Sequence, residues 1–422
     1  MTDPTWTFLH AADLHLDAPL VGLDRYDGAP VEEMRDASRR ALERAVDLAC
    51  EQRVRLAVFA GDLFDGDWRD FNTGLFFRRQ LARLVDAGAR VFLVRGNHDA
   101  VSRVTRELTL PEGVGTFDHR RPETVVLDDL GVALHGQSYA RREVTDNLAA
   151  AYPPPIPGLL NIGVLHTDLA GAAGASPYAP CSVDDLVRSG YQYWALGHMH
   201  TFEVHHRDPW VVMPGTIQGR HARETGPKGV ALVTVADGAI ARVEHWPVDV
   251  ARWVAIDVDA GEDDTAGELI ERFAGKLRRA AEAADGRTLA VRATFSGATR
   301  AHHELATDAD RWRHEVIAAA ADCGVDAWIE KVRWRTRAPV DRDRLAARDD
   351  AIGALIRALR DGAADAELIA SCKRALAPLA AKLPPAVVAG DEPFDLADDD
   401  TIRRLVADAG ELLLAHLVEG GR

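Results

Sequence analysis

The sequence predicts an α/β fold, in which parallel strands are joined and covered by helices. Two observations support this fold class. Short apolar runs, with no room for two helical turns, end abruptly in glycine and polar residues, as Leu56–Ala60 does before Gly61 and Asp62. These runs alternate with stretches of helical periodicity, which is typical of a largely parallel sheet. Such a sheet keeps its ligands at the carboxyl ends of its strands.

The first part of the chain contains three such strands and two helices. The apolar residues of Glu32–Arg53 fall on one helical stripe, and the helix at Thr73–Ala87 ends at Gly88, a natural C-cap. The strands are predicted at Thr5–His10, Leu56–Ala60 and Val91–Val94.

More strands follow, and four of them form two hairpins. The second hairpin turns at Asp237-Gly238, a strong turn signal. The strands are predicted at Thr124–Leu127, Val132–His135, Asn161–Leu165, Tyr193–Leu196, Val230–Val235 and Ala239–Trp246. The first domain is therefore expected to close near Val250.

A smaller α/β unit and a helical region follow. The unit is predicted from strands at Trp253–Val258, Leu289–Phe295 and Ala327–Thr336 and from helices at Glu268–Ala284 and Asp310–Asp322. Beyond Asp341 the pattern is helical, with a loop at Leu383–Asp395 and a last helix at Asp400–Val418. We predict three parts, residues 1–250, 251–340 and 341–422.

Composition restricts the class of protein. The chain has 422 residues, 47% hydrophobic and 27% charged, as globular proteins have. It contains no apolar stretch of membrane-spanning length and no signal-peptide pattern. Its four cysteines are widely spaced, which predicts a reducing, cytoplasmic location. The formal net charge of -16 is unfavourable for unaided nucleic-acid binding, so bound cations or a basic partner would have to offset it.

Five short motifs recur at the ends of apolar strands. Together they offer carboxylate, amide and imidazole donors without thiolate, a set that suits Mn, Fe or Zn better than calcium or structural zinc. Extended backbone would point both side chains of an x-spaced pair to one side. The motifs are Asp13-x-His15, Gly61-Asp62, Gly96-Asn97-His98-Asp99, His166 and Gly197-His198-Met199-His200.

These residue types suit a two-metal phosphoesterase. Two cations about 3.5–4 Å apart can clamp a phosphodiester and lower the pKa of a bridging water. Asp62 is the candidate shared carboxylate, and Asn97 can bind a cation without adding charge. His98 could protonate the leaving oxygen, with Asp99 accepting its second N–H. Asp65 could either bind the site or cap its turn.

The motifs resemble those of the calcineurin-like metallophosphoesterase superfamily. Within it, the chain resembles the Mre11/SbcD family of DNA repair nucleases, especially the YhaO-like bacterial branch, over residues 6 to 250. The resemblance implies a four-layer β-sandwich flanked by helices, with a small α/β capping domain and C-terminal helices. The stretches that carry it are FLHAADLHLDAPL, FAGDLFD, LVRGNHD, VLHTDL, YWALGHMH and MPGTIQGRHARETGPKGV.

The resemblance also implies the ligand sets. One metal would be held by Asp13, His15, Asp62 and His200, and the other by Asp62, Asn97, His166 and His198. The expected ions are two divalent metals, Mn²⁺ first, with Fe²⁺, Zn²⁺ or Mg²⁺ as alternatives. His98 would assist the leaving group. Archaeal and eukaryotic members carry a second catalytic histidine where this sequence has Asp65.

The capping domain of this family contacts DNA. Period two on the last predicted strand places four cations on one face, which suits a phosphate backbone. The residues are Lys331, Arg333, Arg335 and Arg337. A solvated sheet face, or salt bridges to acidic neighbours, is the alternative.

The resemblance implies partners as well. The C-terminal helices match in position the segment by which such nucleases dock an SMC-like coiled-coil ATPase of the Rad50/SbcC kind, and a homodimer is expected. The candidate docking residues, which could equally pack on their own domain, are Leu355, Ile356, Leu359, Leu405, Leu412, Leu413, Leu414 and Leu417. The expected function is a DNA exonuclease, with endonuclease activity as an option. The alternatives are a small-molecule or nucleotide phosphoesterase and a non-catalytic scaffold.

Overall fold

The computed structural model describes most of the chain. The described residues are 5–18, 31–65, 71–102, 108–169, 177–339, 342–350, 353–354, 356–358, 366–388 and 394–419. The chain divides into two compact units. One comprises Met1–Ala255, Arg278–Arg292 and Gly324–Lys331, and the other comprises Ile256–Leu277, Ala293–Cys323 and Val332–Arg422.

The first sheet has six strands in the order β12-β11-β1-β2-β3-β4. Neighbours from β1 to β4 run parallel, which confirms the predicted parallel core, and β11 pairs antiparallel with both β1 and β12. The strands span Thr5–Ala11 (β1), Leu56–Ala60 (β2), Arg90–Val94 (β3), Val114–Thr116 (β4), Gly229–Ala236 (β11) and Ala239–Pro247 (β12). Sequence reasoning missed β4, which is too short to show a pattern.

The second sheet also has six strands, in the order β5-β6-β7-β8-β10-β9. Its centre is parallel, and the hairpin of β5 and β6 is antiparallel as predicted. The strands span Glu123–Leu127 (β5), Val132–Gly136 (β6), Leu160–His166 (β7), Tyr193–Gly197 (β8), Glu203–Arg207 (β9) and Trp210–Met213 (β10). The pair β9 and β10 was not predicted.

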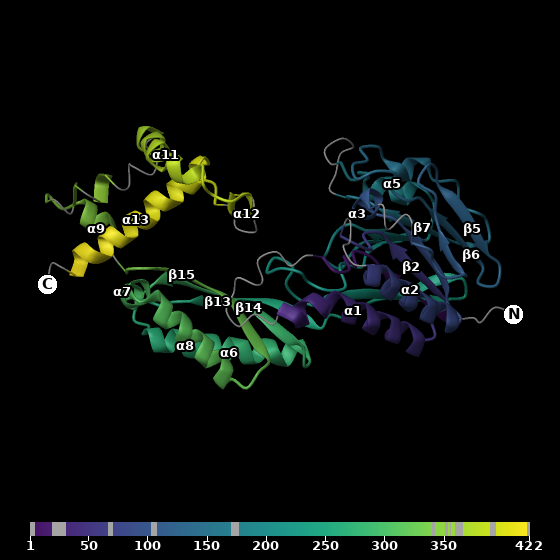
Figure 1. Cartoon of the computed structure of the whole chain (residues 1–422), viewed down its shortest axis with the longest axis horizontal. Helices are drawn as coiled ribbons and strands as arrows, with labels where there is room; N and C mark the ends of the chain where they lie inside the picture. Colours follow the sequence, from purple (N-terminus) through teal and green to yellow (C-terminus); the bar gives the residue numbers. More distant parts are fainter. Residues whose placement is uncertain are drawn as a thin grey trace. The chain divides into compact units, whose positions relative to one another are not determined.

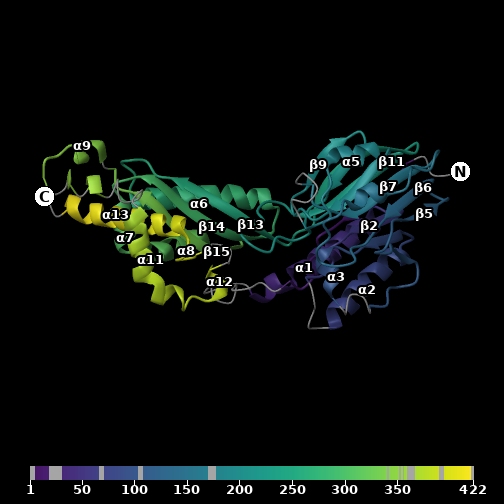
Figure 2. The same ribbon diagram turned by 90° about the horizontal axis from the view of Figure 1, so that it is seen from above.

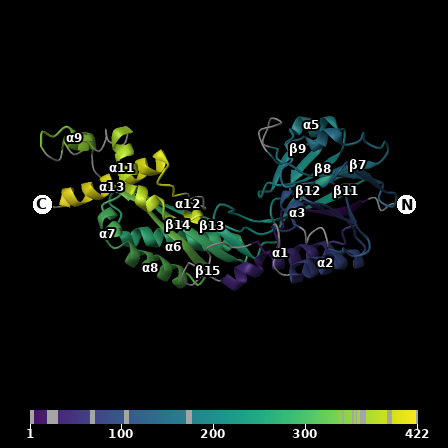
Figure 3. The ribbon, with the colours of Figure 1, turned by 45° about the horizontal axis from the view of Figure 1, so that its top comes forward.

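The two sheets face each other across an apolar core, and helices cover their outer faces. Phe8 of β1 meets Tyr193 of β8 edge-on, with ring centroids 5.2 Å apart. Leu9 and Phe59 point the other way, into a cluster with α1 (Val31–Glu51) and α2 (Phe71–Asp86). On the far side, Trp194 packs with Leu186 of α5 (Val183–Arg188). The resulting four layers, with α5 above and α1 and α2 below, confirm the predicted sandwich (Figure 3).

A three-stranded sheet follows, in the order β13-β14-β15. Its core includes Phe273 of α6, which packs against Phe295, whose ring centroid is 4.6 Å from that of Trp334. Figure 1 shows the elements of this region. They are β13 (Ala251–Asp259), α6 (Ala266–Ala284), β14 (Thr288–Ala298), α7 (His302–Thr307), α8 (Ala309–Asp322) and β15 (Ala327–Arg337).

The C-terminal helices form a small core of their own. Ile369, Leu396 and Ile402 are buried together, with Leu405 packed against them. The helices α11 and α13 lie side by side (Figure 2). The helices are α9 (Arg342–Ala346), α11 (Ala366–Ala380), α12 (Pro385–Val388), which lies in the predicted loop, and α13 (Asp399–Glu419).

The predicted docking face is described only in part. Ile356 is 4% exposed, and Leu405 packs within its own unit. Leu355 and Leu359 lie outside the described residues, as do the side chains of Leu412, Leu413, Leu414 and Leu417. Among the described helices, none is long and apolar enough to cross a membrane.

Candidate metal centre and active site

The five sequence motifs come together where strands of both sheets end. The segments after β1, β2 and β3 lie close to those at the ends of β7 and β8. Hydrogen bonds and ion pairs between the two sheets show this proximity. The residues brought together in this way are Asp13, His15, Asp62, Asn97, His98, His166, His198 and His200.

Asp62 lies at the centre of this cluster and is 2% exposed. Its Oδ2 atom is 3.4 Å from Nε2 of His166 and 3.9 Å from Nε2 of His15. Its Oδ1 atom accepts the backbone N–H of His98 at 3.0 Å. Gly61 allows this approach, since a Cβ there would lie 2.7 Å from Nδ1 of His166, and its φ of +92° disfavours other residues. Asp62 therefore has donor groups on two sides.

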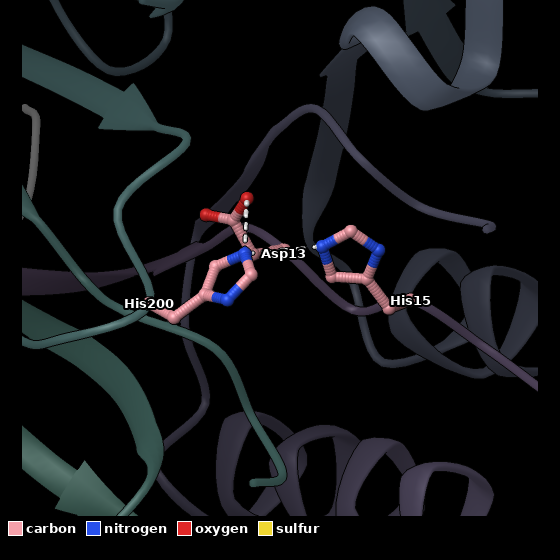
Figure 4. Close-up of side chains that lie close together, drawn as sticks. All are labelled: Asp13, His15 and His200. Carbon is pink, nitrogen blue, oxygen red and sulfur yellow. Dashed lines mark hydrogen bonds and ion pairs between the residues drawn. The ribbon is translucent and has the colours of Figure 1, made fainter. Parts of the chain in front are cut away.

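On one side of the cluster are Asp13, His15 and His200 (Figure 4). The Nε2 atoms of His15 and His200 are 3.2 Å apart, and Nε2 of His200 is 3.8 Å from Oδ1 of Asp13. Asp13 is fully buried, and its carboxylate accepts the backbone N–H of His198 at 2.9 Å. Two imidazole nitrogens and a carboxylate thus converge on one point.

On the other side, His166 lies between Asn97 and His198. Nδ1 of His166 donates to the carbonyl of Ala60 at 2.9 Å, so Nε2 faces the cluster, 3.0 Å from Oδ1 of Asn97. The His198 ring stands edge-on to the His166 ring, with centroids 5.3 Å apart. This half offers an amide oxygen and imidazole groups beside the Asp62 carboxylate.

The backbone that aims these side chains differs from the prediction. The x-spaced pairs are not extended: φ is 51° at Asp13, 41° at His15 and 115° at His198. Asp62 also has a positive φ of 51°. Left-handed conformations in non-glycine residues are strained and persist where surrounding structure fixes them. The side chains converge because of these turns, and the prediction from strand periodicity was wrong.

Charge is finely balanced in the cluster. Burial lowers the pKa of His166, but the Asp62 carboxylate, together with Asp13 and the carbonyl of Ala60, outweighs burial and raises the pKa to about 9. Burial, and then the charge of His166, lower the pKa of His198 to about 4. Burial alone would raise the pKa of Asp62, yet the neighbouring histidines hold it well below its usual range. The negative charge that stabilises a proton on His166 would equally attract a metal cation.

His98 has a different partner from the one predicted. Its Nδ1 atom is 2.7 Å from Oδ1 of Asp65, and this hydrogen bond is the largest cause of the raised pKa of His98. The predicted partner, Asp99, instead accepts the backbone N–H groups of Gly96 at 2.9 Å and of Leu63 and Phe64 at 3.1 Å. The reason is local: Asp99 lies in the first turn of α3 (Asn97–Val101), so its side chain reaches back to the helix start. Asp99 therefore fastens two loops together.

Sequence reasoning gave no role to Glu224, which contacts His200. Its Oε1 atom is 2.6 Å from Nδ1 of His200, and its carboxyl is buried. Burial raises the pKa of Glu224, but its hydrogen bond to His200 and the charge of Arg220 hold the pKa below its usual range. The signal was present in the stretch QGRHARETGPKG, whose residues carried no assigned role.

The predicted basic row alternates clearly with packed residues only at its end, from Trp334 to Arg337. On β15, Trp334 packs against Phe295, and Oγ1 of the buried Thr336 is 3.0 Å from Nδ1 of His302. The cations alternate with these packed residues. Arg335 and Arg337 are exposed, whereas Lys331 and Arg333 are half-buried and interact with other groups.

The donor set fits a pair of divalent cations. The Nδ1 atoms of His166 and His200 are occupied by a carbonyl and a carboxylate, so each Nε2 is left to face the cluster. Metal-binding histidines are held in this way. Among the described residues, three groups have ligand atoms within 4.8 Å of one another: Asp13, His15 and His200; His15, Asp62 and His98; Asp13, Asp62 and His166.

Two family models match the chain. The model described as calcineurin-like phosphoesterase matches residues 7–202. The model described as metallophosphoesterase YhaO, middle domain, matches residues 253–337. The matched ranges contain the sandwich with its candidate metal centre and the three-stranded sheet, respectively.

The chain is also similar to known proteins. It is 36% identical over 280 residues to the uncharacterized metallophosphoesterase YhaO of Bacillus subtilis, covering 65% of this chain and 68% of that protein. It is 25% identical over 359 residues to the DNA double-strand break repair protein Mre11 of Methanopyrus kandleri, covering 78% and 70%. The Mre11 protein of Sulfurisphaera tokodaii is 24% identical over 271 residues, covering 60% and 65%.

Proposed function

This chain belongs to the calcineurin-like metallophosphoesterases, in their YhaO-like branch, and on that premise we propose that it is a DNA phosphodiesterase of DNA repair. Membership makes it a metal-dependent phosphoesterase whose fold binds two divalent metals. The proposed reaction is exonucleolytic, with endonuclease activity as a second mode. The observation that carries the proposal is the buried Asp62 carboxylate between two groups of donors.

The proposed ligand sets follow the two sides of the cluster. Asp13, His15, Asp62 and His200 would hold one ion, and Asp62, Asn97, His166 and His198 would hold the other. The chemistry that two divalent ions supply in such a site is stabilisation of phosphate charge and a lowered pKa for an attacking water. Mn²⁺ is the proposed native metal, because oxygen and imidazole donors are mixed here.

His98 is the proposed acid that protonates the leaving oxygen. Its side chain is 29% exposed, so a substrate can reach it, unlike the buried His166. Because the Asp65 carboxylate accepts from Nδ1, the opposite nitrogen, Nε2, is left to deliver a proton. Asp65 holds the ring in this orientation and favours its protonated form.

DNA is the proposed substrate for two reasons. Relatives at 24–25% identity are named as DNA double-strand break repair proteins. The exposed Arg335 and Arg337, with Lys331 and Arg333 on the same strand face, provide cations spaced along β15 that suit a phosphate backbone.

The proposed setting is a complex in the cytoplasm. A net charge of -16 disfavours an unaided grip on DNA, so we propose that the protein works with an SMC-like coiled-coil ATPase. The resemblance to the Mre11/SbcD family also favours a homodimer. The C-terminal helices are the proposed docking segment.

A direct test offers the purified protein, with Mn²⁺, three substrates: linear duplex DNA, single-stranded DNA and bis-p-nitrophenyl phosphate. We expect all three substrates to be hydrolysed. The coiled-coil ATPase should stimulate the cleavage of DNA but not the hydrolysis of the small ester. Hydrolysis of the small ester without any cleavage of DNA, with the ATPase also supplied, would favour the small-molecule alternative. Turnover of none of them would favour a scaffold.

A further inference from the structure

The segment between β10 and β11 surrounds His200. The imidazole of His200 turns Nε2 toward Asp13 and His15 (Figure 4). Its opposite nitrogen, Nδ1, is 2.6 Å from Oε1 of Glu224. One ring thus joins the candidate metal centre to a carboxylate behind it.

Glu224 is itself fixed in place. Its Oε2 atom accepts the backbone N–H of Arg220 at 2.7 Å, and its Oε1 atom accepts from the Arg220 guanidinium at 3.2 Å. The Glu224 side chain is 7% exposed. The carboxylate therefore cannot turn away from His200 without losing these bonds in a site with little access for water.

The backbone of His200 is held by the same segment. Nζ of Lys228 donates to the carbonyl of His200 at 3.0 Å. Gly215 lies against this stretch with a φ of +76°, and a Cβ there would lie 2.8 Å from the backbone nitrogen of Phe202. The segment thus grips both the ring and the main chain of His200.

The contacts also decide which ring nitrogen carries the proton. Nη2 of Arg220 lies 3.2 Å from Nδ1 of His200. If Nδ1 accepted from Arg220, a neutral ring would carry its proton on Nε2 and present N–H to the cluster. Because an ionised carboxylate oxygen can only accept, Nδ1 of a neutral His200 ring donates to Glu224 at 2.6 Å, and Nε2 keeps its lone pair.

We propose that Glu224 is a positioning residue for the metal centre, which sets the tautomer and orientation of His200. The inference rests on the proposed two-metal function. It gives the QGRHARETGPKG stretch a structural role, because this stretch closes behind a ligand that lies 24 residues away from Glu224 along the chain. Partners of this kind typically change metal affinity about 10–100-fold when they are removed.

The experiment compares Glu224→Ala and Glu224→Gln with wild type. A matched control is Glu203→Gln, because Glu203 also faces a histidine, with Oε1 3.5 Å from Nδ1 of His205, but is exposed on β9. Equilibrium dialysis with Mn²⁺ measures the number of bound ions and their affinities. Glu224→Ala should lower the affinity for one of the two Mn²⁺ ions about 10–100-fold. Glu224→Gln, whose amide oxygen can still accept, should weaken it less, and Glu203→Gln should leave both unchanged.

A second readout follows the tautomer in the metal-free protein by ¹⁵N NMR of the imidazoles at a pH where the His200 ring is neutral. The His200 signals are those that His200→Gln removes. Wild type should show the proton on Nδ1, and Glu224→Ala should shift it toward Nε2. If Glu224→Ala does not fold, the smaller loss of Mn²⁺ affinity expected for Glu224→Gln tests the positioning role instead.

The outcomes separate the two claims. Equal Mn²⁺ affinity in wild type and the Glu224 variants, with an unchanged tautomer, would overturn the positioning role and leave the proposed function standing. A wild-type protein that binds fewer than two ions would refute the two-metal function. The tautomer would then still report whether Glu224 controls the His200 ring.

Discussion

The candidate metal centre and the basic row on β15 place charge in opposite ways. In the metal centre, residues from five separate motifs meet with Asp13 fully buried and Asp62 2% exposed. On β15, four cations follow one another along a single strand, and Arg335 and Arg337 stay exposed. Bond cleavage needs fixed groups in a protected site, whereas an electrostatic grip on DNA works with exposed, separate charges. Substitutions in the two regions should therefore differ in kind as well as size.

The largest effect is expected for Asp62→Asn. The shared carboxylate is lost, so binding of both ions should weaken, and the rate on bis-p-nitrophenyl phosphate should fall at least about 10⁴-fold. Lewis-acid stabilisation is worth several kcal/mol, and each 1.36 kcal/mol is tenfold in rate. Retention of near wild-type turnover would show that Asp62 is not shared between ions.

His98→Ala should lower the rate about 10²–10⁴-fold, the usual contribution of a general acid, while both Mn²⁺ ions stay bound. The control is His119→Ala, which removes an exposed histidine with Nδ1 2.9 Å from Asp118 and should leave the rate unchanged. Loss of a metal ion from His98→Ala would make His98 a ligand.

Asp65→Asn should cost about 10- to 100-fold, because a charge-assisted hydrogen bond of about 1.5–3 kcal/mol is lost. The acid form of His98 disappears as pH rises through its pKa, and Asp65 raises that pKa. Without Asp65 the pKa falls, so the alkaline decline of kcat should begin at a lower pH. The control is Asp118→Asn, which should not change the pH dependence. If kcat of Asp65→Asn declined at the same pH as in wild type, Asp65 would have no role in proton transfer by His98.

The smallest effect on chemistry is expected for the double variant Arg335→Ala/Arg337→Ala. Hydrolysis of bis-p-nitrophenyl phosphate should be unchanged, because these residues belong to the other region. DNA affinity should fall, and the slope of log affinity against log salt should decrease by roughly 0.9 for each duplex phosphate that the protein no longer neutralises. Arg403→Ala, an exposed arginine on α13, is the control. An unchanged slope would mean that this strand face is solvated and does not contact DNA.

The sequence predicted the sandwich well where strands are buried on both faces. In β2 all five residues are buried, so an apolar run marked the strand. The prediction failed for β9 (Glu203–Arg207), which lies at a sheet edge and has four polar residues around the single apolar Val204, so it shows no apolar run.

Side-chain partners were harder to predict than the site itself. Asp99 was predicted to be the hydrogen-bond partner of His98 because the two residues are adjacent in the sequence. In the structure, Asp99 turns back to the N-terminus of α3, and Asp65, 33 residues before His98, contacts the ring instead. Likewise, Glu224 reaches His200 only through the fold of the intervening chain. Sequence spacing contains no information about such contacts.

The proposed chemistry depends on two cations that share Asp62. Its most direct test is a crystal structure of the Mn²⁺-soaked protein with anomalous scattering measured at the manganese edge. We expect two peaks about 3.5–4 Å apart, with the Asp62 carboxylate bound to both ions. A single peak, or two peaks of which Asp62 touches only one, would contradict it.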